Sequence, residues 1–169
     1  MLCRMKTVIQ RVSRASVRIA GEVRAEIGRG LLLLVGVEVG DGDAQAEALA
    51  KKVAGLRIFD DDAGKMNLSN EQVGGEVLAV SQFTLCADLS RGKRPGFDPA
   101  MRPPEAERLY ERFCGALEQS TGRPVKRGVF GASMQVELVN DGPATFLLAV
   151  APADSSWSGA REGAVDRRP

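Results

Sequence analysis

The chain has 169 residues, with 23 lysines and arginines against 22 aspartates and glutamates. This length fits one domain. The nearly neutral balance leaves no large basic field for gripping DNA or a long stretch of RNA backbone, so no DNA partner is expected. The sequence also contains no histidine, which excludes Ser-His and Cys-His catalytic groups.

The cysteines and the hydropathy pattern set further limits. Cys3, Cys86 and Cys114 are odd in number, far apart and without CxxC spacing. We therefore expect no disulfide, no metal site and a cytoplasmic location. No run of about 20 apolar residues is present, and the first residues lack the apolar core of a signal peptide, so no membrane partner is expected. Glycine-rich nucleotide-binding motifs are also absent, which predicts no cofactor.

The first part of the chain alternates apolar and polar residues, the period of half-buried strands. We predict strands over residues 6–12, 15–19 and 23–27. Residues 31–39 are apolar on both faces, which is typical of a strand in the middle of a core.

Two segments have the apolar spacing of amphipathic helices. Residues 44–56 form the first, with Asp43 as the predicted N-cap. The second is predicted to open at Pro103-Pro104 and to close at Thr121-Gly122.

The remaining segments complete a predicted α+β fold. Three further strands are expected over residues 76–85, 133–140 and 144–150, the last two joined through Asp141-Gly-Pro143. The sheet is predicted to be mostly antiparallel and barrel-like, with two helices packed on it, in a single domain over residues 5–150. Residues 151–169 are polar and rich in small side chains, which predicts a disordered tail.

Polar residues interrupt the predicted strand at 76–85 near its end. Ser81, Gln82 and Thr84 bring three hydrogen-bonding side chains into an otherwise apolar segment. A buried polar group without a partner costs about 1 to 3 kcal/mol. These side chains therefore bind either loop backbone or a ligand, and the segment alone leaves both readings open.

The segment Asn140-Asp-Gly-Pro143 is an unusual turn. Asp-Gly favours a two-residue hairpin, but Pro143 cannot donate the hydrogen bond expected of the next strand residue. The proline can adopt a cis bond, and Gly142 permits close approach by another molecule. An ordinary surface turn remains the alternative.

Two other segments are candidates for ligand contacts. Phe130 and Met134 flank small residues, an arrangement that suits either a slot for a flat ring or the core. Arg91, Lys93 and Arg94 form a short basic cluster that suits either a phosphate or solvent. The acidic run Asp60–Asp62 lacks the further spacing of a calcium loop and is interpreted as a turn.

In combination, these segments resemble the D-aminoacyl-tRNA deacylase family. The resemblance covers residues 5–150 and rests on four pieces that occur in the family's order: MKTVIQRV at 5–12 with ASV at 15–17, SQFTL at 81–85, FGASM at 130–134 and NDGPAT at 140–145. The combination is far more specific than any one piece.

The resemblance implies a homodimer that acts on the acceptor end of aminoacyl-tRNA. The turn at Gly142-Pro143, with a cis bond, would enter the active site of the partner subunit. Arg11 would brace this turn. The remaining assignments are catalytic positions at Ser81, Gln82, Phe83 and Thr84, and contacts to the terminal adenosine at Phe130 and Met134.

The implied chemistry needs no strong base, because an aminoacyl ester is already an activated acyl group. The backbone N–H groups of Phe83 and Thr84 are candidate oxyanion donors, and in the family the 2'-hydroxyl of the terminal ribose is thought to help activate water. Carbonyl oxygens of the Gly142-Pro143 turn would hold the substrate amino group and block an L side chain. Glycine lacks a side chain and should escape this filter.

Three alternatives stay open at this point. The Thr84 hydroxyl could act as a covalent nucleophile, although no activating base is evident. The chain could belong to the related subfamily that clears L-alanine from mischarged tRNA, with a trans bond at the turn, although Ser81 and Phe83 match the D-specific pattern better. It could also be a non-catalytic RNA-binding dimer that uses the loop at 91–94.

Overall fold

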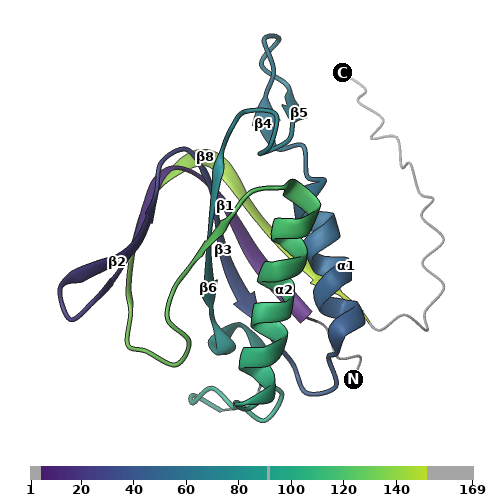
Figure 1. Cartoon of the computed structure of the whole chain (residues 1–169). Helices are drawn as coiled ribbons and strands as arrows, with labels where there is room; N and C mark the ends of the chain where they lie inside the picture. The colour runs from purple at the N-terminus through teal and green to yellow at the C-terminus, as the bar shows by residue number, and fades with distance from the viewer. Residues whose placement is uncertain (1–4, 91, 152–169) are drawn as a thin grey trace, which may run out of the picture.

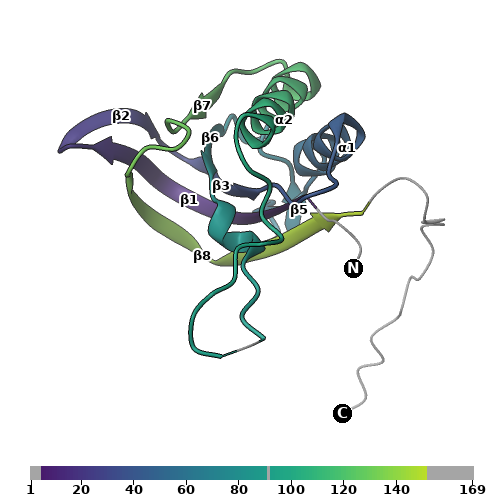
Figure 2. The same cartoon turned by 90° about the horizontal axis from the view of Figure 1, so that it is seen from below.

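Two helices cover one face of a six-stranded sheet (Figure 1). The structure is a computed structural model that describes residues 5–90 and 92–151. Helices α1 (Asp43–Ala54) and α2 (Glu105–Thr121) lie on the same side of the sheet, as Figure 2 shows. The predicted tail lies outside the described residues from position 152 onward.

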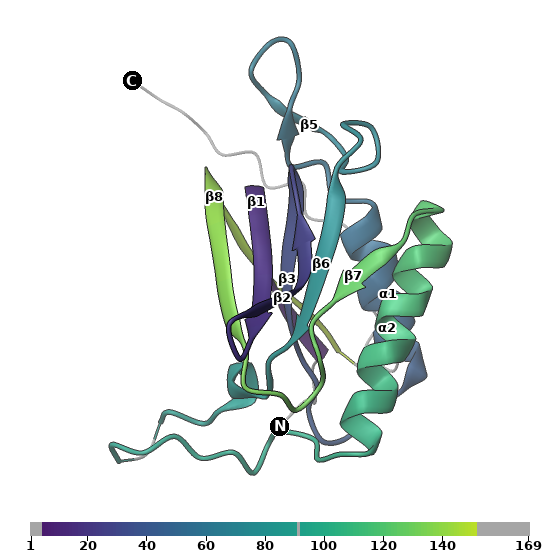
Figure 3. The same cartoon turned by 60° about the vertical axis from the view of Figure 1, so that its left-hand side comes forward.

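The strands of the main sheet follow the order β2-β1-β3-β6-β7, with β8 beside β1. Figure 3 shows β8, β1, β3, β6 and β7 from left to right across the sheet. A small separate hairpin is formed by β4 and β5. The bounds are β1 (Met5–Ile19), β2 (Glu22–Ile27), β3 (Gly30–Gly36), β4 (Phe59–Asp60), β5 (Met66–Leu68), β6 (Glu76–Ser81), β7 (Val125–Arg127) and β8 (Gln135–Val150).

The sheet is mixed, with antiparallel and parallel pairings. Strand β1 pairs antiparallel with β2, β3 and β8, whereas β3–β6 and β6–β7 are parallel. The parallel pairings arise where α1 and α2 lie in the connections, because parallel strands need a crossover. The α+β class with two helices and a barrel-like sheet is confirmed, and the antiparallel share is smaller than predicted.

The sheet curls until its two ends approach each other. Lys126 of β7 donates a hydrogen bond to the backbone oxygen of Glu26 in β2 (2.7 Å) and forms an ion pair with Glu76 (2.7 Å). The hydrogen bond to Glu26 joins β7 to β2, which are not paired with each other, and this gives the sheet its nearly closed shape.

Strand β3 is central, and its residues reach two cores. Leu31 and Leu33 pack under the helices with Leu49 and Phe113. Leu32 points the other way, into a second core enclosed by the curl of the sheet; its other buried members are Val12, Ala15, Val17, Ile27, Leu78 and Val80. Burial on both faces confirms the prediction from its apolar run, but the strand ends at Gly36 rather than at 39.

Strands β1 and β8 are longer than predicted. Residues 6–12 and 15–19 belong to one strand, as do residues 133–140 and 144–150 from Gln135 onward, because β1 and β8 pair with each other along most of their lengths. The pairing is irregular near Val12. The local patterns identified the halves of each strand but not their continuity.

The helix ends agree in part with the predictions. Gly42, not Asp43, is the N-cap of α1, and the Gln45 side chain accepts the backbone N–H of Gly42 (2.9 Å). Gly122 ends α2 with a φ of 65°, a conformation that glycine adopts without strain. The Pro103-Pro104 bond before α2 is cis. No helix within the described ranges is long and apolar enough to span a bilayer.

Asp41 is a buried carboxylate between β3 and α1. Its Oδ2 accepts the backbone N–H of Glu38 (2.7 Å), while Oδ1 has no hydrogen-bond partner among the described residues. Burial raises the pKa of Asp41 to about 6, against the opposing effect of the backbone hydrogen bond. The charged form is therefore disfavoured in the folded chain.

We expect the contribution of Asp41 to stability to increase as the pH falls from about 8 to about 5. The folded chain takes up a proton near pH 6, whereas the unfolded chain does so only near the ordinary value of 3.8. By pH 5 the gain should be about 1 kcal/mol, since one pKa unit corresponds to about 1.4 kcal/mol. Asp41→Asn should remove this gain, and urea unfolding of both proteins at the two pH values measures it. Identical pH dependence in the two proteins would contradict the assignment.

Candidate active site

Ser81 is the last residue of β6, where a buried strand reaches the edge of the sheet. Residues 77–80 are buried, and Ser81 is half-buried. The N–H of Gln82 still bonds to Val35 of β3 (2.7 Å), and the chain then turns into the short helix η1 (Phe83–Cys86). The predicted strand at 76–85 was thus too long, because the polar residues at its end leave the sheet.

Glycine at position 36 allows η1 to pack against the end of β3. A Cβ atom at Gly36 would lie 2.9 Å from the sulfur of Cys86 and 3.1 Å from the Cβ of Leu85. Burial raises the pKa of the Cys86 thiol to about 11, so this thiol is protonated at neutral pH and is no nucleophile. Cys86 therefore anchors η1 through packing.

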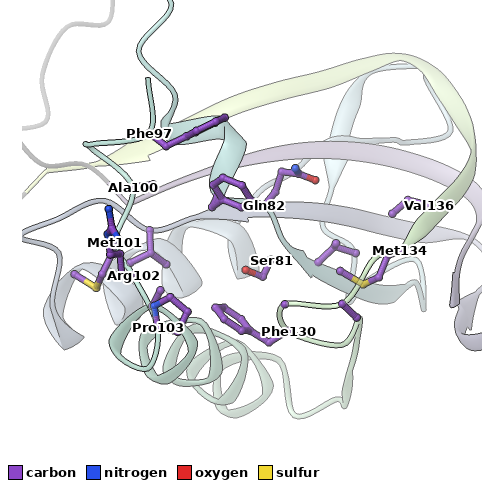
Figure 4. Close-up of a pocket in the computed structure, with 16 residues that line it drawn as sticks. Ser81, Gln82, Phe97, Ala100, Met101, Arg102, Pro103, Phe130, Met134 and Val136 are labelled. Carbon is purple, nitrogen blue, oxygen red and sulfur yellow. The ribbon is translucent and has the colours of Figure 1, made fainter. Parts of the chain in front are cut away.

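A cavity of about 780 Å³ opens beside Ser81, a size in the range of small-molecule sites. Figure 4 shows the residues around it. They come from the residue after β3, the end of β6, η1, the segment before α2 and its first turn, and the segment entering β8 and its first residues. The lining consists of Val37, Val80, Ser81, Gln82, Phe83, Phe97, Ala100, Met101, Arg102, Pro103, Ala106, Phe130, Gly131, Ala132, Met134 and Val136.

Aromatic rings and a thioether form much of the wall. Phe83 is 56% exposed and meets Phe97 edge to face, with ring centroids 5.1 Å apart. Phe130 contacts the buried ring of Tyr110 in a tilted arrangement, with ring centroids 6.2 Å apart. Such surfaces suit a flat or apolar group.

Met134 occupies space left by a glycine. A Cβ atom at Gly128 would lie 2.8 Å from the Met134 sulfur, so a larger residue there would displace it. The slot inferred for Phe130 and Met134 is therefore part of this cavity, and both residues line it.

The cavity unites most of the predicted catalytic positions but not all of them. Ser81, Gln82 and Phe83 line it, whereas Thr84 does not. Thr84 is exposed, and its hydroxyl accepts a hydrogen bond from the Gln82 amide. The backbone N–H groups of Phe83 and Thr84 begin η1, and the first N–H groups of a helix have no acceptor inside it.

Sequence reasoning missed the wall formed by Phe97 and by residues 100–103. These residues lie in the connection before α2, which has no periodic pattern. Only the tertiary fold brings this connection to the end of β6. The basic character of the neighbouring loop was the single available signal.

Residues 141–144 form a bulge in β8 rather than a hairpin turn. Gln10 pairs with Thr145, and Val12 pairs with Asn140. One residue of β1, Arg11, therefore faces four residues of β8. The strand keeps its direction along β1, which corrects the expectation that two strands meet at a turn. Gly142 and Pro143 are exposed, and the bond between them is cis.

Arg11 holds this bulge from inside the molecule. The residue is 4% exposed. Its Nε donates to the backbone oxygen of Asp141 (2.9 Å), and its Nη1 donates to that of Ile58 (2.8 Å). The carboxylates of Asp141 and Asp60 lie 3.2 and 3.4 Å from the guanidinium. The bulge is thus tied to both β1 and the β4–β5 hairpin.

A second set of contacts closes the base of the bulge. The Asn140 amide donates to the backbone oxygens of Arg11 (3.0 Å) and Ala144 (3.2 Å). A Cβ atom at Gly142 would lie 2.7 Å from Asn140 Oδ1. Any residue larger than glycine would therefore disturb the Asn140 bridge.

The bulge and the cavity lie at opposite ends of the sheet. Val12, beside the bulge, pairs with Gly30 at the start of β3, whereas Ser81 pairs with Val35. Five residue steps along β3 correspond to about 17 Å. Figure 1 shows the bulged part of β8 near the β4–β5 end, while β6 ends at the other. A protomer therefore cannot place the bulge in its own cavity.

Comparison with known proteins gives a consistent result. The family model described as D-Tyr-tRNA(Tyr) deacylase matches residues 8–149. A D-aminoacyl-tRNA deacylase of Geobacter sulfurreducens is 55% identical over 90% of this chain and 99% of its own. The protein of the same name from Anaeromyxobacter dehalogenans is 58% identical over 85% of this chain and 96% of its own.

Two solved structures share the fold of this chain. A structure described as "c-Myc DNA Unwinding Element Binding Protein" is 42% identical, with a TM-score of 0.82, and covers 88% of this chain and 100% of its own. A probable eukaryotic D-amino acid tRNA deacylase is 15% identical with a TM-score of 0.77, over 87% and 100%, which supports the fold alone. With the family model spanning nearly all of the described residues, the chain belongs to the D-Tyr-tRNA(Tyr) deacylase family.

Proposed function

We propose that this chain hydrolyses the ester bond of D-aminoacyl-tRNA in the cavity beside Ser81, as a homodimer in which the bulge of one protomer enters the cavity of its partner. Family membership and the names of the relatives support the reaction. The observation that carries the dimer is the separation of an exposed, firmly held bulge from its own cavity. In a two-fold symmetric dimer, the bulge of each protomer would meet the cavity of the other, which gives two equivalent sites.

The reaction requires an oriented water molecule and a stabilised oxyanion rather than a strong base. An aminoacyl ester is activated, so the main requirement is stabilisation of the oxyanion that develops when water attacks. The N–H groups of Phe83 and Thr84 at the start of η1 are suited to this task, since preorganised donors of this kind contribute about 3 kcal/mol each. The 2'-hydroxyl of the terminal ribose would help to activate water.

Selection by chirality would come from the main chain of the bulge. Carbonyl oxygens of Gly142 and Pro143 from the partner would accept the substrate amino group and occupy the space into which an L side chain projects. A D side chain would point outward. Because Arg11 and Asn140 hold the bulge rigidly, an L substrate could not push it aside at low energetic cost.

The proposal predicts faster hydrolysis of D-tyrosyl-tRNA than of L-tyrosyl-tRNA. Pro143→Ala should displace the carbonyl groups of the bulge and reduce the ratio of the two rates by about tenfold or more. A tenfold change corresponds to a loss of only about 1.4 kcal/mol in the discrimination between the two substrates. Parallel deacylation assays of both substrates measure the ratio, with circular dichroism as the control for folding. Equal rates for the wild-type protein on D and L substrates would refute the gate.

Mixed dimers test the contribution of the partner subunit. Ala132→Phe should fill the cavity, and Gly142→Val should displace Asn140 from the base of the bulge, so that each variant alone is inactive. In co-expressed dimers, half would be mixed and each would contain one intact site, so activity should return to about a quarter of the wild-type value. No recovery in purified mixed dimers would mean that the bulge does not act across subunits.

Glycyl-tRNA should also be cleaved, because glycine has no side chain for the bulge to exclude. Purified protein is expected to release glycine from glycyl-tRNA under conditions in which L-tyrosyl-tRNA stays intact. Intact glycyl-tRNA in an assay that consumes D-tyrosyl-tRNA would contradict the proposed filter.

Thr84→Ala should retain most of the wild-type kcat. The substitution removes the hydroxyl, which lies outside the cavity lining, but keeps the backbone N–H. Steady-state kinetics on D-tyrosyl-tRNA measure the effect. Complete loss of activity in a folded variant would favour a covalent threonine nucleophile instead, and tRNA binding without any turnover in the wild-type protein would favour a non-catalytic RNA-binding dimer.

A further inference from the structure

Arg102 is the single charged residue among the sixteen that line the cavity. It lies immediately before α2, and its backbone oxygen accepts the N–H of Ala106 (3.1 Å), which ties it to the start of that helix. The rest of the wall is apolar or uncharged. Arg102 is exposed to solvent, so its charge is available to a negatively charged group of a ligand in the cavity.

The guanidinium of Arg102 has no ion-pair partner within residues 5–90 and 92–151. Arg108, one and a half turns further along, lies 2.6 Å from Asp43 and 2.7 Å from Glu105, and Arg112 forms an ion pair with Glu47. Both arginines of α2 are thus paired with carboxylates, whereas Arg102, in the segment before the helix, has no such counter-ion among the described residues. Such a group can bind an anion without first breaking an ion pair.

The position of Arg102 suits one end of an elongated ligand. In Figure 4, Arg102 and Pro103 lie on one side of the cavity and Met134 on the other, with Ser81 and Phe130 between them. A nucleoside against Phe130 and Met134, with its ester near Ser81, would carry its 5'-phosphate toward the remaining side. Guanidinium groups bind phosphate through paired hydrogen bonds.

We propose that Arg102 binds the phosphate on the 5' oxygen of the terminal ribose of the substrate. This inference rests on the proposed function and assigns a residue that distinguishes a nucleotide from a nucleoside in the cavity. The phosphate is remote from the reacting ester and unchanged during hydrolysis. Arg102 therefore contributes equally to binding of the substrate and of the transition state, which alters KM and not kcat.

A matched pair of small substrates isolates this contact. The D-tyrosyl ester of adenosine lacks the phosphate, and the D-tyrosyl ester of AMP carries it. Arg102→Gln should raise the KM of the AMP ester about tenfold and leave that of the adenosine ester unchanged, with kcat unaffected for both. Arg102→Lys should retain part of the preference, because an ammonium binds phosphate as a point charge.

Arg108→Gln is the matched control, since it removes the same unit charge from the nearby α2, outside the cavity lining. It should change neither KM. Equal effects of Arg102→Gln and Arg108→Gln would indicate a general electrostatic field and overturn the proposal. A loss confined to D-aspartyl-tRNA, with D-tyrosyl-tRNA unaffected, would place the amino-acid carboxylate at Arg102 and would overturn it as well.

Binding measurements separate this inference from the proposed function. By calorimetry, the wild-type protein should bind AMP more tightly than adenosine, and Arg102→Gln should abolish the difference. Absence of ester hydrolysis by the wild-type protein would refute the deacylase function without affecting this comparison. An equal Kd for AMP in the wild-type and Arg102→Gln proteins would refute the role of Arg102 alone.

Discussion

The position of the bulge in β8 depends on the hydrogen bonds and ion pairs of the buried Arg11 guanidinium. A charge that is 4% exposed is tolerated only when it is paired and hydrogen-bonded. Its partners are two backbone oxygens and two carboxylates, contributed by Asp141 of the bulge, by Ile58 and by Asp60 of the small hairpin. Displacement of the bulge would cost Arg11 both its backbone hydrogen bond and its ion pair with Asp141, so this contact fixes the bulge relative to the rest of the sheet.

The distance between the rigid bulge and the cavity decides how the bulge can act. The same strand, β3, passes beside the bulge at Gly30 and beside Ser81 at Val35, so the sheet itself sets the spacing between the two features. Neither is complete alone: the cavity is open at its mouth, and the bulge projects into solvent in the isolated chain. The dimer that we propose would turn this separation into two equivalent sites, each closed by a surface that the substrate cannot reshape.

The sequence predicted those features that depend on local chemistry. The apolar run of β3 and the glycine after α2 were identified correctly because burial and left-handed backbone each have a local signature. The bulge was interpreted as a turn because the pairing of Asn140 and Thr145 with β1 is a long-range property. Arg102 was missed for the same reason, since nothing in its neighbours shows that the connection before α2 returns to the end of β6.

The site has few side chains that could act as a nucleophile or as a general base. The chain has no histidine, and burial raises the pKa values of the thiols of Cys86 and Cys114 to about 11 and about 12, which keeps both protonated near neutral pH. The Thr84 hydroxyl already accepts a hydrogen bond from Gln82 and lies outside the cavity lining. The Ser81 hydroxyl lines the cavity, but the lining holds no carboxylate or lysine that could deprotonate it. Backbone dipoles at the start of η1 are therefore the polar groups best placed to act on an ester. Such a site works only on a substrate that is already activated, and this requirement matches the aminoacyl ester of the proposed reaction.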